Sequence, residues 1–385
     1  MPSPQKPTPQ PAENSATAML WTGLMGVALI VVAASGKRRG TSSSLLSERS
    51  EPVQTEGAHS FSGSEAEAVA ASEPDRGRSA RTPREISASG WKDIAYRVYL
   101  EFNKDRVLSV AGGVTFFTLL SLVPAIAALV SCYGLFADAT VINGHLSAMQ
   151  GVLPSGAVEI IGDQVKRIAQ RSNESLGFTF FTSLVISLWS ANAAVKAIFD
   201  ALNVVYEEEE KRSFVMLNLR SLTFTIGALV FIILALTGIV VLPLVLNFLG
   251  LGQGAWLIAQ LRWPALLVVL LGGLALLYRY GPSRERARWR WVGTGSVVAG
   301  LLWLVASILF SWYVANFGNY NETYGSLGAV VGFMTWIWIS TTIVLLGGEI
   351  NAEMEHQTAR DTTTGPEQPM GLREARMADT LGAAA

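Results

Sequence analysis

Cysteine and histidine are almost absent from this chain of 385 residues. There is one cysteine, Cys132, and there are three histidines, His59, His145 and His356. A single cysteine cannot form an intrachain disulfide, and a thiol inside an apolar run is usually a packing residue. The three histidines lie far apart and have no metal-ligand spacing. We therefore expect neither thiol redox chemistry nor a metal centre, and no cofactor.

Charged residues are also scarce. They make up 15% of the chain, whereas half of the residues are hydrophobic and fall into several uninterrupted runs. Such a sequence does not fold around one water-soluble core, so it predicts a membrane protein. No phosphate-binding loop, dinucleotide fingerprint or Ser/His/Asp arrangement can be assembled. This excludes ATP-driven transport by the chain itself and gives a soluble enzyme no support.

The long apolar runs predict an all-α integral membrane protein with a six-helix transmembrane core. Each run meets the length that a bilayer requires, although one contains Pro243 and another is near the lower limit. In chain order the runs are 107–136, a run that begins at residue 178, 219–246, 263–280, 291–315 and 325–348.

Outside the core, composition predicts an anchor and two disordered segments. The run 16–34 is followed at once by Lys37, Arg38 and Arg39, which is the reverse of a signal peptide. We therefore expect domains at 1–36 (N-terminal segment with a retained anchor helix), 37–90 (disordered cytoplasmic linker), 91–356 (six-span domain) and 357–385 (disordered cytoplasmic tail).

Amphipathic patterns predict interfacial helices in addition to the spans. In 91–106 the apolar residues Trp91, Ile94, Val98 and Phe102 recur at helical spacing, with charges on the other side. Two more apolar stripes lie on either side of Pro154. We expect them to form short helices on the membrane surface or over one end of the bundle.

Lysine and arginine are distributed unequally between the connections. One side of the bundle has four, three and then five of them, twelve in all, and the other side has four. By the positive-inside rule, both ends of the core are expected in the cytoplasm. The twelve are Lys92, Arg97, Lys104, Arg106, Lys211, Arg212, Arg220, Arg279, Arg284, Arg286, Arg288 and Arg290, and the four are Lys166, Arg167, Arg171 and Arg262.

One apolar run carries a stripe of polar residues. Asn192, Lys196 and Asp200 recur at every fourth position and Asn203 follows, so a helix aligns all four. Ionisable groups at membrane depth cost about 2.5–3.5 kcal/mol each, so the stripe should avoid lipid. It is either part of a functional site or an internal Lys196–Asp200 pair that stabilises the bundle.

A second polar group ends the last run. Glu349, Asn351 and Glu353 emerge near the same predicted membrane boundary as Asp200. Two antiparallel helices would bring these groups to one level, which leads us to predict a polar cluster with a Lys196–Glu349 pair. The alternatives are ordinary solvation of the carboxylates at the interface and pairing of Lys196 with Asp200.

Proline and small residues mark positions where helices can bend or approach one another. Pro124 should kink the first core span, and Ser121 can satisfy backbone groups that the proline frees. In the last span, small residues and a G-x-x-x-G spacing predict close helix packing. These small residues are Gly325, Ser326, Gly328 and Gly332.

A set of short motifs resembles the YihY/virulence factor BrkB family of bacterial inner-membrane proteins, some of which are labelled ribonuclease BN. The match covers roughly 91–356 and rests on the order and spacing of the motifs, although Phe116 and Phe117 stand where many members have tyrosines. The motifs are SLVP at 121–124, LWSA at 188–191, ALN at 201–203, EKRSF at 210–214, YGSLGA at 324–329 and GEINAE at 348–353.

Three functions are compatible with this sequence. A transporter or lipid-translocating protein would use the polar stripe as a lining and Pro124 as part of a moving element. An envelope scaffold would use the same residues only to join helices, and an intramembrane enzyme such as a ribonuclease lacks a recognisable acid, base or ligand set. Membrane lipids and a small-molecule or lipid substrate are the expected partners, and nucleic acid is not.

Overall fold

The computed structural model of the chain describes residues 58–59, 63–134, 176–237, 252–317 and 327–384. The predicted anchor at 16–34 lies outside the described residues. So do the two amphipathic stripes around Pro154, together with Gly325 and Ser326 of the last span.

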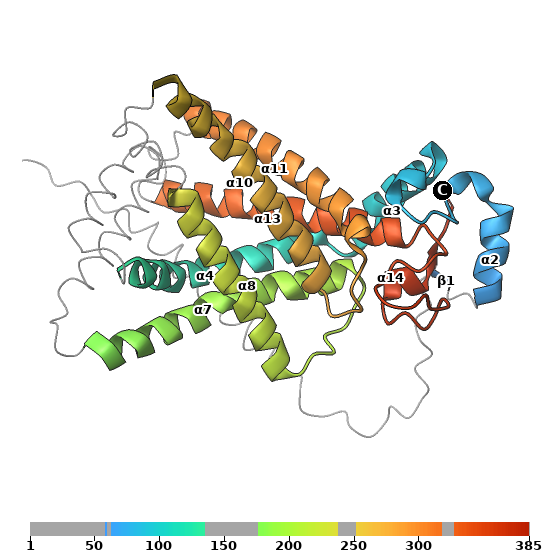
Figure 1. The fold of residues 1–385 in the computed structure, drawn as a ribbon, viewed down its shortest axis with the longest axis horizontal. Coiled ribbons are helices and arrows are strands. Elements are labelled where there is room, and N and C mark those ends of the chain that lie inside the picture. Colours follow the sequence, from blue (N-terminus) through green and yellow to red (C-terminus); the bar gives the residue numbers. More distant parts are fainter. Residues whose placement is uncertain (1–57, 60–62, 135–175, 238–251, 318–326, 385) are drawn as a thin grey trace, which may run out of the picture. The chain divides into compact units, whose positions relative to one another are not determined.

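Six long helices form the described core (Figure 1), and they confirm an all-α integral membrane protein. Five of them contain stretches long and apolar enough to cross a membrane. The sixth, α10, has a shorter apolar part, Pro264–Tyr280, where the sequence predicted a span near the lower limit. The helices are α4 (Val107–Gly134), α7 (Leu176–Val205), α8 (Phe214–Leu236), α10 (Gly252–Tyr280), α11 (Trp289–Phe317) and α13 (Leu327–Glu355).

Local sequence determines where these helices begin and end. Ser213 caps α8 by accepting a hydrogen bond from the backbone N–H of Met216 at 3.4 Å, and so satisfies a donor that the first turn leaves free. Arg106, at φ 50°, separates α4 from the preceding helix α3 (Ala88–Lys104). Glu207, at φ 51°, follows the end of α7 in the same left-handed conformation. These breaks turn the chain at one end of the bundle.

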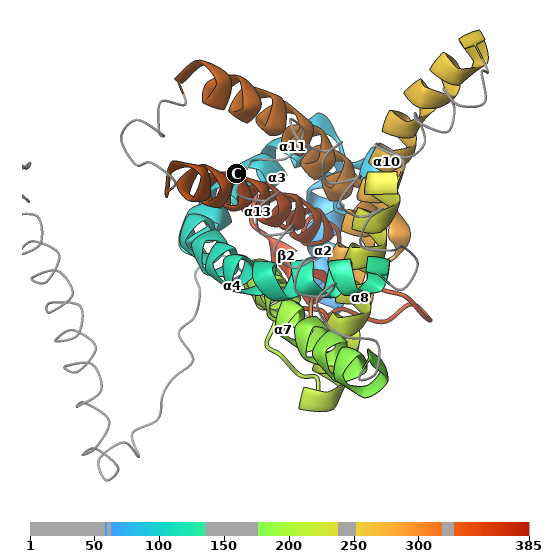
Figure 2. The ribbon, with the colours of Figure 1, turned by 90° about the vertical axis from the view of Figure 1, so that its left-hand side faces the viewer.

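Helix α13 lies at the centre of the packing. It contacts α11, α4, α3 and α7, and Figure 2 shows it between α11 and α4. Neighbouring helices can be followed in the order α8, α7, α4, α13, α11 and α10. The main buried cluster draws on several of these helices and includes Leu202, Tyr206, Tyr278 and Leu345.

The closest helix approach is between α11 and α13. A Cβ atom built on Gly295 would lie 2.1 Å from the carbonyl oxygen of Gly347, and one on Gly347 would lie 2.9 Å from that of Gly295. The sequence had placed the close contacts elsewhere. A Cβ atom on Gly332, one of the small residues of the predicted contact, would meet nothing within 4 Å in the described part of the chain, so Gly332 makes no close helix contact there.

Helix α4 continues through Pro124 to Gly134. The hydroxyl of Ser121 donates to the backbone carbonyl of Ser190 in α7, at 3.3 Å. It therefore links two helices, which is not the role we predicted for it within its own helix. Thr118 bonds back to the carbonyl of Val114 at 2.8 Å, one turn earlier.

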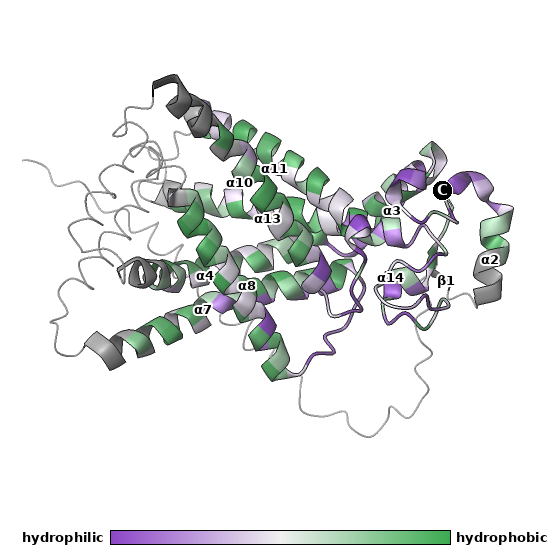
Figure 3. Ribbon diagram, viewed as in Figure 1, coloured by the Kyte–Doolittle hydropathy of each residue, from purple (hydrophilic) through white to green (hydrophobic). Residues whose placement is uncertain are grey.

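The segments on either side of the core fold onto it, together with the connection between α10 and α11. We call residues 58–59, 63–90, 281–288 and 356–384 the terminal cap. The cap is rich in hydrophilic residues, coloured purple in Figure 3; it lies at one end of the bundle and contains the short helix α14 (Arg376–Asp379). Ala80 and Ile86 are buried with Trp291 and Met354, and Met377 joins the main cluster.

This result corrects the disordered tail and the last part of the disordered linker that composition predicted. Composition counts the apolar residues of each segment alone, but here the segments bond to each other. The N–H of Ala359 donates to Arg78 and the hydroxyl of Thr358 donates to Ala80, at 2.8 and 2.7 Å. At the far end, strand β1 (Ala58–His59) pairs with strand β2 (Leu381–Gly382). The cap also includes helix α2 (Gly63–Ser72) at its edge, and the short 3-10 helices η1 (Pro74–Arg76) and η2 (Pro83–Glu85).

Helix α3 has the amphipathic pattern that the sequence predicted, but protein covers its apolar side. Ile94 and Val98 are buried against a cluster that contains Met354 of α13. Tyr96, Tyr99 and Leu100, by contrast, are exposed. These exposed residues are the side of α3 that can reach the membrane interface.

Candidate functional site

The stripe on α7 faces α8 at its middle. Asn192 is fully buried and accepts a hydrogen bond from Thr225 of α8 at 3.0 Å. One turn further on, the ammonium group of Lys196 donates to the side-chain oxygen of Asn218 of α8 at 3.2 Å. We call this contact, made by Asn192, Lys196, Asn218 and Thr225, the α7–α8 seam. It is a row of polar pairs inside two apolar helices.

Lys196 has only neutral groups as close partners. Besides Asn218, its ammonium group lies 5.6 Å from the ring centre of Trp189, which is half exposed. In the described part of the chain, Lys196 forms no ion pair. Asp200, one turn away on α7, is exposed and in electrostatic range of Lys196, but the two form no ion pair. A lysine at this depth without a carboxylate partner is expensive unless an anion reaches it.

Three arginines lie near the end of the seam where α8 begins. Arg212 precedes α8 and Arg220 is in its second turn, and Arg220 is in electrostatic range of Arg212 and Arg286. Arg212 is bonded to Glu210, with Nε 2.6 Å from a carboxylate oxygen. Although burial acts to raise it, the hydrogen bonds from Arg212 and Asn203 lower the pKa of Glu210 to about 2.

Asn203 serves the connections at this end of the bundle. Its side-chain nitrogen donates to Glu210 at 3.2 Å, and its side-chain oxygen accepts the backbone N–H of Ser283 at 2.8 Å. It therefore joins the connection after α7 to the one after α10. In this position Asn203 stabilises the turns and lies off the α7–α8 seam.

Glu349 is the least satisfied polar side chain of the α13 group. It is fully buried, and neither carboxylate oxygen has a hydrogen-bond partner among the described residues. The charges that act on it are the carboxylates of Asp105, Glu353, Glu101 and Glu207. The predicted Lys196–Glu349 pair is therefore wrong: Lys196 bonds to α8, whereas Glu349 is surrounded by other acids.

Asn351 and Glu353 point to different neighbours from Glu349. Asn351 accepts the backbone N–H of Gly295 at 2.8 Å and donates to the carbonyl of Val292 at 3.2 Å, so it locks α13 to α11. Glu353 accepts from Nε of Arg97 in α3 at 2.6 Å. Six of the seven predicted polar residues thus divide between the α7–α8 seam, the turns and the surroundings of α13, and the seventh, Asp200, is exposed on α7.

The structure adds Asp105, which the sequence analysis did not select. It follows α3, and burial raises its pKa to about 7, with a further contribution from the charge of Glu101. Nearby, Lys104 lies 2.7 Å from Glu101 and 2.9 Å from Glu207. The sequence did contain a signal for Asp105, because it is an acidic residue directly before a membrane span and close to glutamates at the same end of the bundle.

A buried ion pair holds the connection before α11. Both side chains of Arg284 and Glu355 are fully buried, and two hydrogen bonds of 2.9 and 2.8 Å join them. Arg284 also lies 4.2 Å from the ring centre of Tyr206. Among the described residues, no group of three or more His, Cys, Asp or Glu side chains is arranged to hold a metal ion.

Comparison with known proteins gives one family. The family described as virulence factor BrkB matches residues 98–371. A ribonuclease-like protein of Bacillus subtilis, YfkH, is 32% identical over 63% of this chain and 88% of its own length. A UPF0761 membrane protein of Aggregatibacter aphrophilus is 22% identical over 68% of this chain and 92% of its own. No solved structure matches the chain.

Proposed function

The chain belongs to the virulence factor BrkB family, and we propose that it translocates an anionic lipid or solute across the bacterial inner membrane, with both ends of its six-helix core in the cytoplasm. Lys196 carries this proposal. It lies in a membrane-spanning helix, bonds to the neutral side chain of Asn218, and has no ion pair among the described residues.

A purely structural role explains this lysine poorly. A lysine that joins two helices inside a membrane normally pairs with a carboxylate, because an uncompensated charge there costs several kcal/mol. Asn218 supplies one neutral acceptor, and Trp189 supplies the face of an aromatic ring. A passing phosphate or carboxylate group would supply the missing negative charge, so the seam is suited to binding an anion for a short time.

The basic residues near the start of α8 also support the proposal that the translocated substrate is an anion. Arg220 is within the first part of the span and Arg286 is in electrostatic range of it, whereas Arg212 is paired with Glu210. Cations at the mouth of a path raise the local concentration of anions. An anionic headgroup attracted there would find Lys196 further along the same pair of helices.

Glu349 is a second reason to prefer a moving protein to a static one. A carboxyl group that is fully buried, without a hydrogen bond, and near other carboxylates destabilises the packing that holds it. Ionisable groups retained in such places usually take part in function. We assign Glu349 to the conformational cycle and not to anion binding, since the charges around it are negative.

The test is a flux measurement on purified protein in liposomes. Phosphatidylglycerol labelled with a fluorescent headgroup is incorporated, and quenching by external dithionite reports how fast inner-leaflet lipid reaches the outer leaflet. We expect the full chain to speed this exchange over protein-free liposomes. Lys196→Met should slow it at least tenfold, whereas Lys196→Arg should retain it.

Lys92→Met is the matched control, because Lys92 is an exposed lysine of α3 outside the seam. It should leave the rate within twofold of the starting protein. A radiolabelled organic anion assayed in the same liposomes covers a soluble substrate. If neither probe moves faster than in protein-free liposomes, the translocation proposal is rejected.

An envelope scaffold is the second candidate. The buried Arg284–Glu355 pair and the helix contacts made by Asn351 favour it, because they join helices and connections through polar groups that are paired within the protein. In a scaffold Lys196→Met would lower the melting temperature and the amount of protein in the membrane, with no flux to lose. No contact in the described part of the chain favours the ribonuclease activity that the name of the Bacillus relative suggests.

A further inference from the structure

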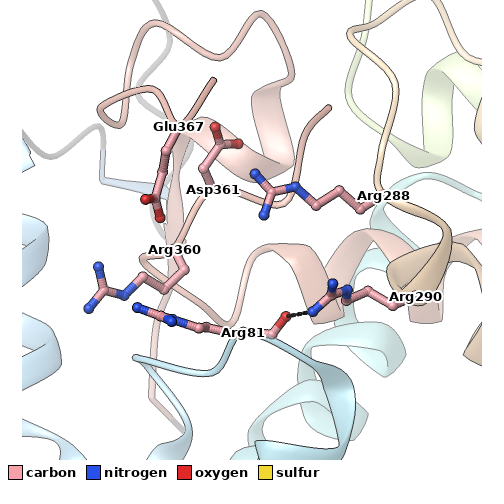
Figure 4. A pocket seen from close by; sticks show the side chains of 6 residues that line it. All are labelled: Arg81, Arg288, Arg290, Arg360, Asp361 and Glu367. Carbon is pink, nitrogen blue, oxygen red and sulfur yellow. Dashed lines mark hydrogen bonds between the residues drawn. The ribbon is translucent and has the colours of Figure 1, made fainter. Parts of the chain in front are cut away.

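A small cavity opens in the terminal cap beside the start of α11. Its volume is about 300 Å³, which is the lower end of the range for small-molecule sites. Figure 4 shows that its lining comes from three separate parts of the chain: the segment before α3, the start of α11 and the tail. The lining residues are Arg81, Arg288, Arg290, Arg360, Asp361 and Glu367.

The four arginines are only partly neutralised, by Glu85, which lies outside the lining in electrostatic range of Arg81 and Arg290. None of them forms an ion pair in the part of the chain that the structure describes. Arg288 donates from Nε to the carbonyl of Thr363 at 2.7 Å, and Arg290 makes one long hydrogen bond, 3.5 Å, to the carbonyl of Arg81. Arg81, Arg290 and Arg360 are exposed. Most of their N–H donors are therefore available to a ligand.

The two acidic residues do not cancel this charge. Asp361 is buried, and its oxygens accept the N–H groups of Thr363 and Gln368 at 2.9 Å and the hydroxyl of Thr363 at 2.7 Å. Its role is to shape the turn of the tail. Glu367 is exposed on the rim. Four guanidinium groups against two carboxylates leave the lining with a formal charge of +2.

The position of the cavity brings it to the level of the membrane surface. Arg288 and Arg290 flank Trp289, the first residue of an apolar span, and Trp289 packs edge-on against Tyr280 at 6.5 Å between ring centres. Aromatic residues of this kind occupy the headgroup region of a bilayer. A ligand could therefore enter either from the water or from the headgroup layer.

We propose that this cavity is a binding site for a phosphate group, either that of a phospholipid headgroup or that of a soluble phosphate compound. Guanidinium groups bind phosphate through paired N–H donors, with a geometry that a lysine cannot reproduce. Bound phosphate would connect Arg81, Arg288 and Arg360, and so fasten the two flanking segments to α11. The inference is independent of the proposed translocation, since no lining residue belongs to α7 or α8.

The experiment uses the full-length protein, purified in detergent and stripped of lipid. Its melting temperature is measured with dihexanoyl-phosphatidylglycerol below its micelle concentration in one arm and with pyrophosphate in the other. Sodium chloride at equal ionic strength is the reference for each. A saturable rise in one arm above the chloride reference is expected, and the arm in which it occurs identifies the source of the phosphate.

The double variant Arg81→Gln/Arg360→Gln should weaken that binding at least tenfold. Arg84→Gln is the matched control, an exposed arginine of the same segment that does not line the cavity, and it should bind within twofold of the starting protein. All three altered side chains are exposed, so folding should be preserved, and the melting temperature without ligand verifies this. No rise in either arm, an equal effect of chloride, or unchanged binding by the double variant would each refute the site.

Discussion

Several carboxyl groups lie within electrostatic range of one another at one end of the bundle. They belong to Glu101, Asp105, Glu207 and Glu349. Lys104 is bonded to two of them, Glu101 and Glu207. Glu353 is paired with Arg97, but in the described part of the chain neither Asp105 nor Glu349 forms an ion pair. For Asp105, burial therefore favours the uncharged carboxyl group in the folded protein.

For Asp105 this has a measurable effect on stability against pH. Its pKa is raised from 3.8 to about 7 in the folded protein, chiefly by burial. A group with a raised folded pKa stabilises most below its unfolded pKa, so this stabilisation is complete below about pH 4 and is lost as pH rises through 7. We expect Asp105→Asn to lessen the fall in melting temperature between pH 5 and pH 8, measured in detergent.

Glu209→Gln is the control for that comparison, because Glu209 is an exposed acid at the same end of the bundle. It should leave the pH dependence as it is in the starting protein. A fall in melting temperature of the same size in Asp105→Asn as in the starting protein would show that Asp105 is charged throughout this range.

At the level of single residues, sequence reasoning located the polar positions but not their partners. Spacing along α7 correctly aligned Asn192 with Lys196, and both reach α8. The pairing of Lys196 with Glu349 failed because depth along a helix can be counted, whereas the rotation of the helix about its axis cannot. Asn218 and Thr225 of α8 were missed for the same reason.

At the level of elements, the contact between α11 and α13 is the least tolerant of added volume. The backbone of Gly347 lies where a side chain on Gly295 would be, at 2.1 Å from its Cβ atom. We expect Gly295→Ala to destabilise the protein by about 1–3 kcal/mol or more, because backbone cannot yield as a flexible side chain does. Unfolding followed in mixed micelles would measure this.

The matched substitution on α13 is Gly332→Ala. A methyl group there meets open space, and alanine is the better helix former, so stability should hold or rise slightly. Equal losses for the two variants would mean that the helices do not pack through Gly295.

The helices themselves could be predicted because each span needs only its own composition and length. Residues 291–315, for example, correspond to α11, Trp289–Phe317. Contacts between helices were harder to predict. We selected the Gly328-x-x-x-Gly332 spacing, whereas the contact in the structure uses Gly295 and Ala299 of α11, also four residues apart, against Gly347 of α13.

At the level of the whole molecule, the connections after α7 and after α10 lie at the same end of the bundle as the tail after α13. Glu207, after α7, lies 2.8 Å from Arg376 of the tail, and Arg284, before α11, is paired with Glu355 at the end of α13. This agrees with an even number of core spans. Which end faces the cytoplasm rests on the twelve-to-four distribution of lysine and arginine.

Cysteine labelling tests this orientation. In a Cys132→Ala background, Lys166→Cys in intact spheroplasts should react with a membrane-impermeant maleimide. Glu209→Cys should react only after the membrane is permeabilised. The reverse pattern would invert the protein, and labelling of both positions from outside would contradict the six-span core.

The prediction from composition differs most from the structure in the terminal cap, most of which was predicted to be disordered but is folded. Residues 357–384 contain few large apolar side chains, and that is typical of a disordered tail. They are ordered by Arg373, which is buried and donates to the carbonyls of Ala359 and Ala378 at 2.8 and 2.6 Å, and by the hydrogen bonds to residues 78 and 80. Polar contacts between segments about 280 positions apart leave no local trace in a sequence.

The pairing of β1 with β2 sets an order of events during biosynthesis. Ala58 and His59 are synthesised before the six core helices, but their partners, Leu381 and Gly382, are synthesised after all of them. The hydrogen bond from Arg97 to the carbonyl of Ala383 likewise forms only after residue 383 has been synthesised. Since helices enter the membrane as they are synthesised, the bundle is inserted before its cap can close. A chain that ended before residue 381 could not form the β1–β2 pairing. Its cap would stay unfolded and be accessible to the proteases that remove unfinished membrane proteins.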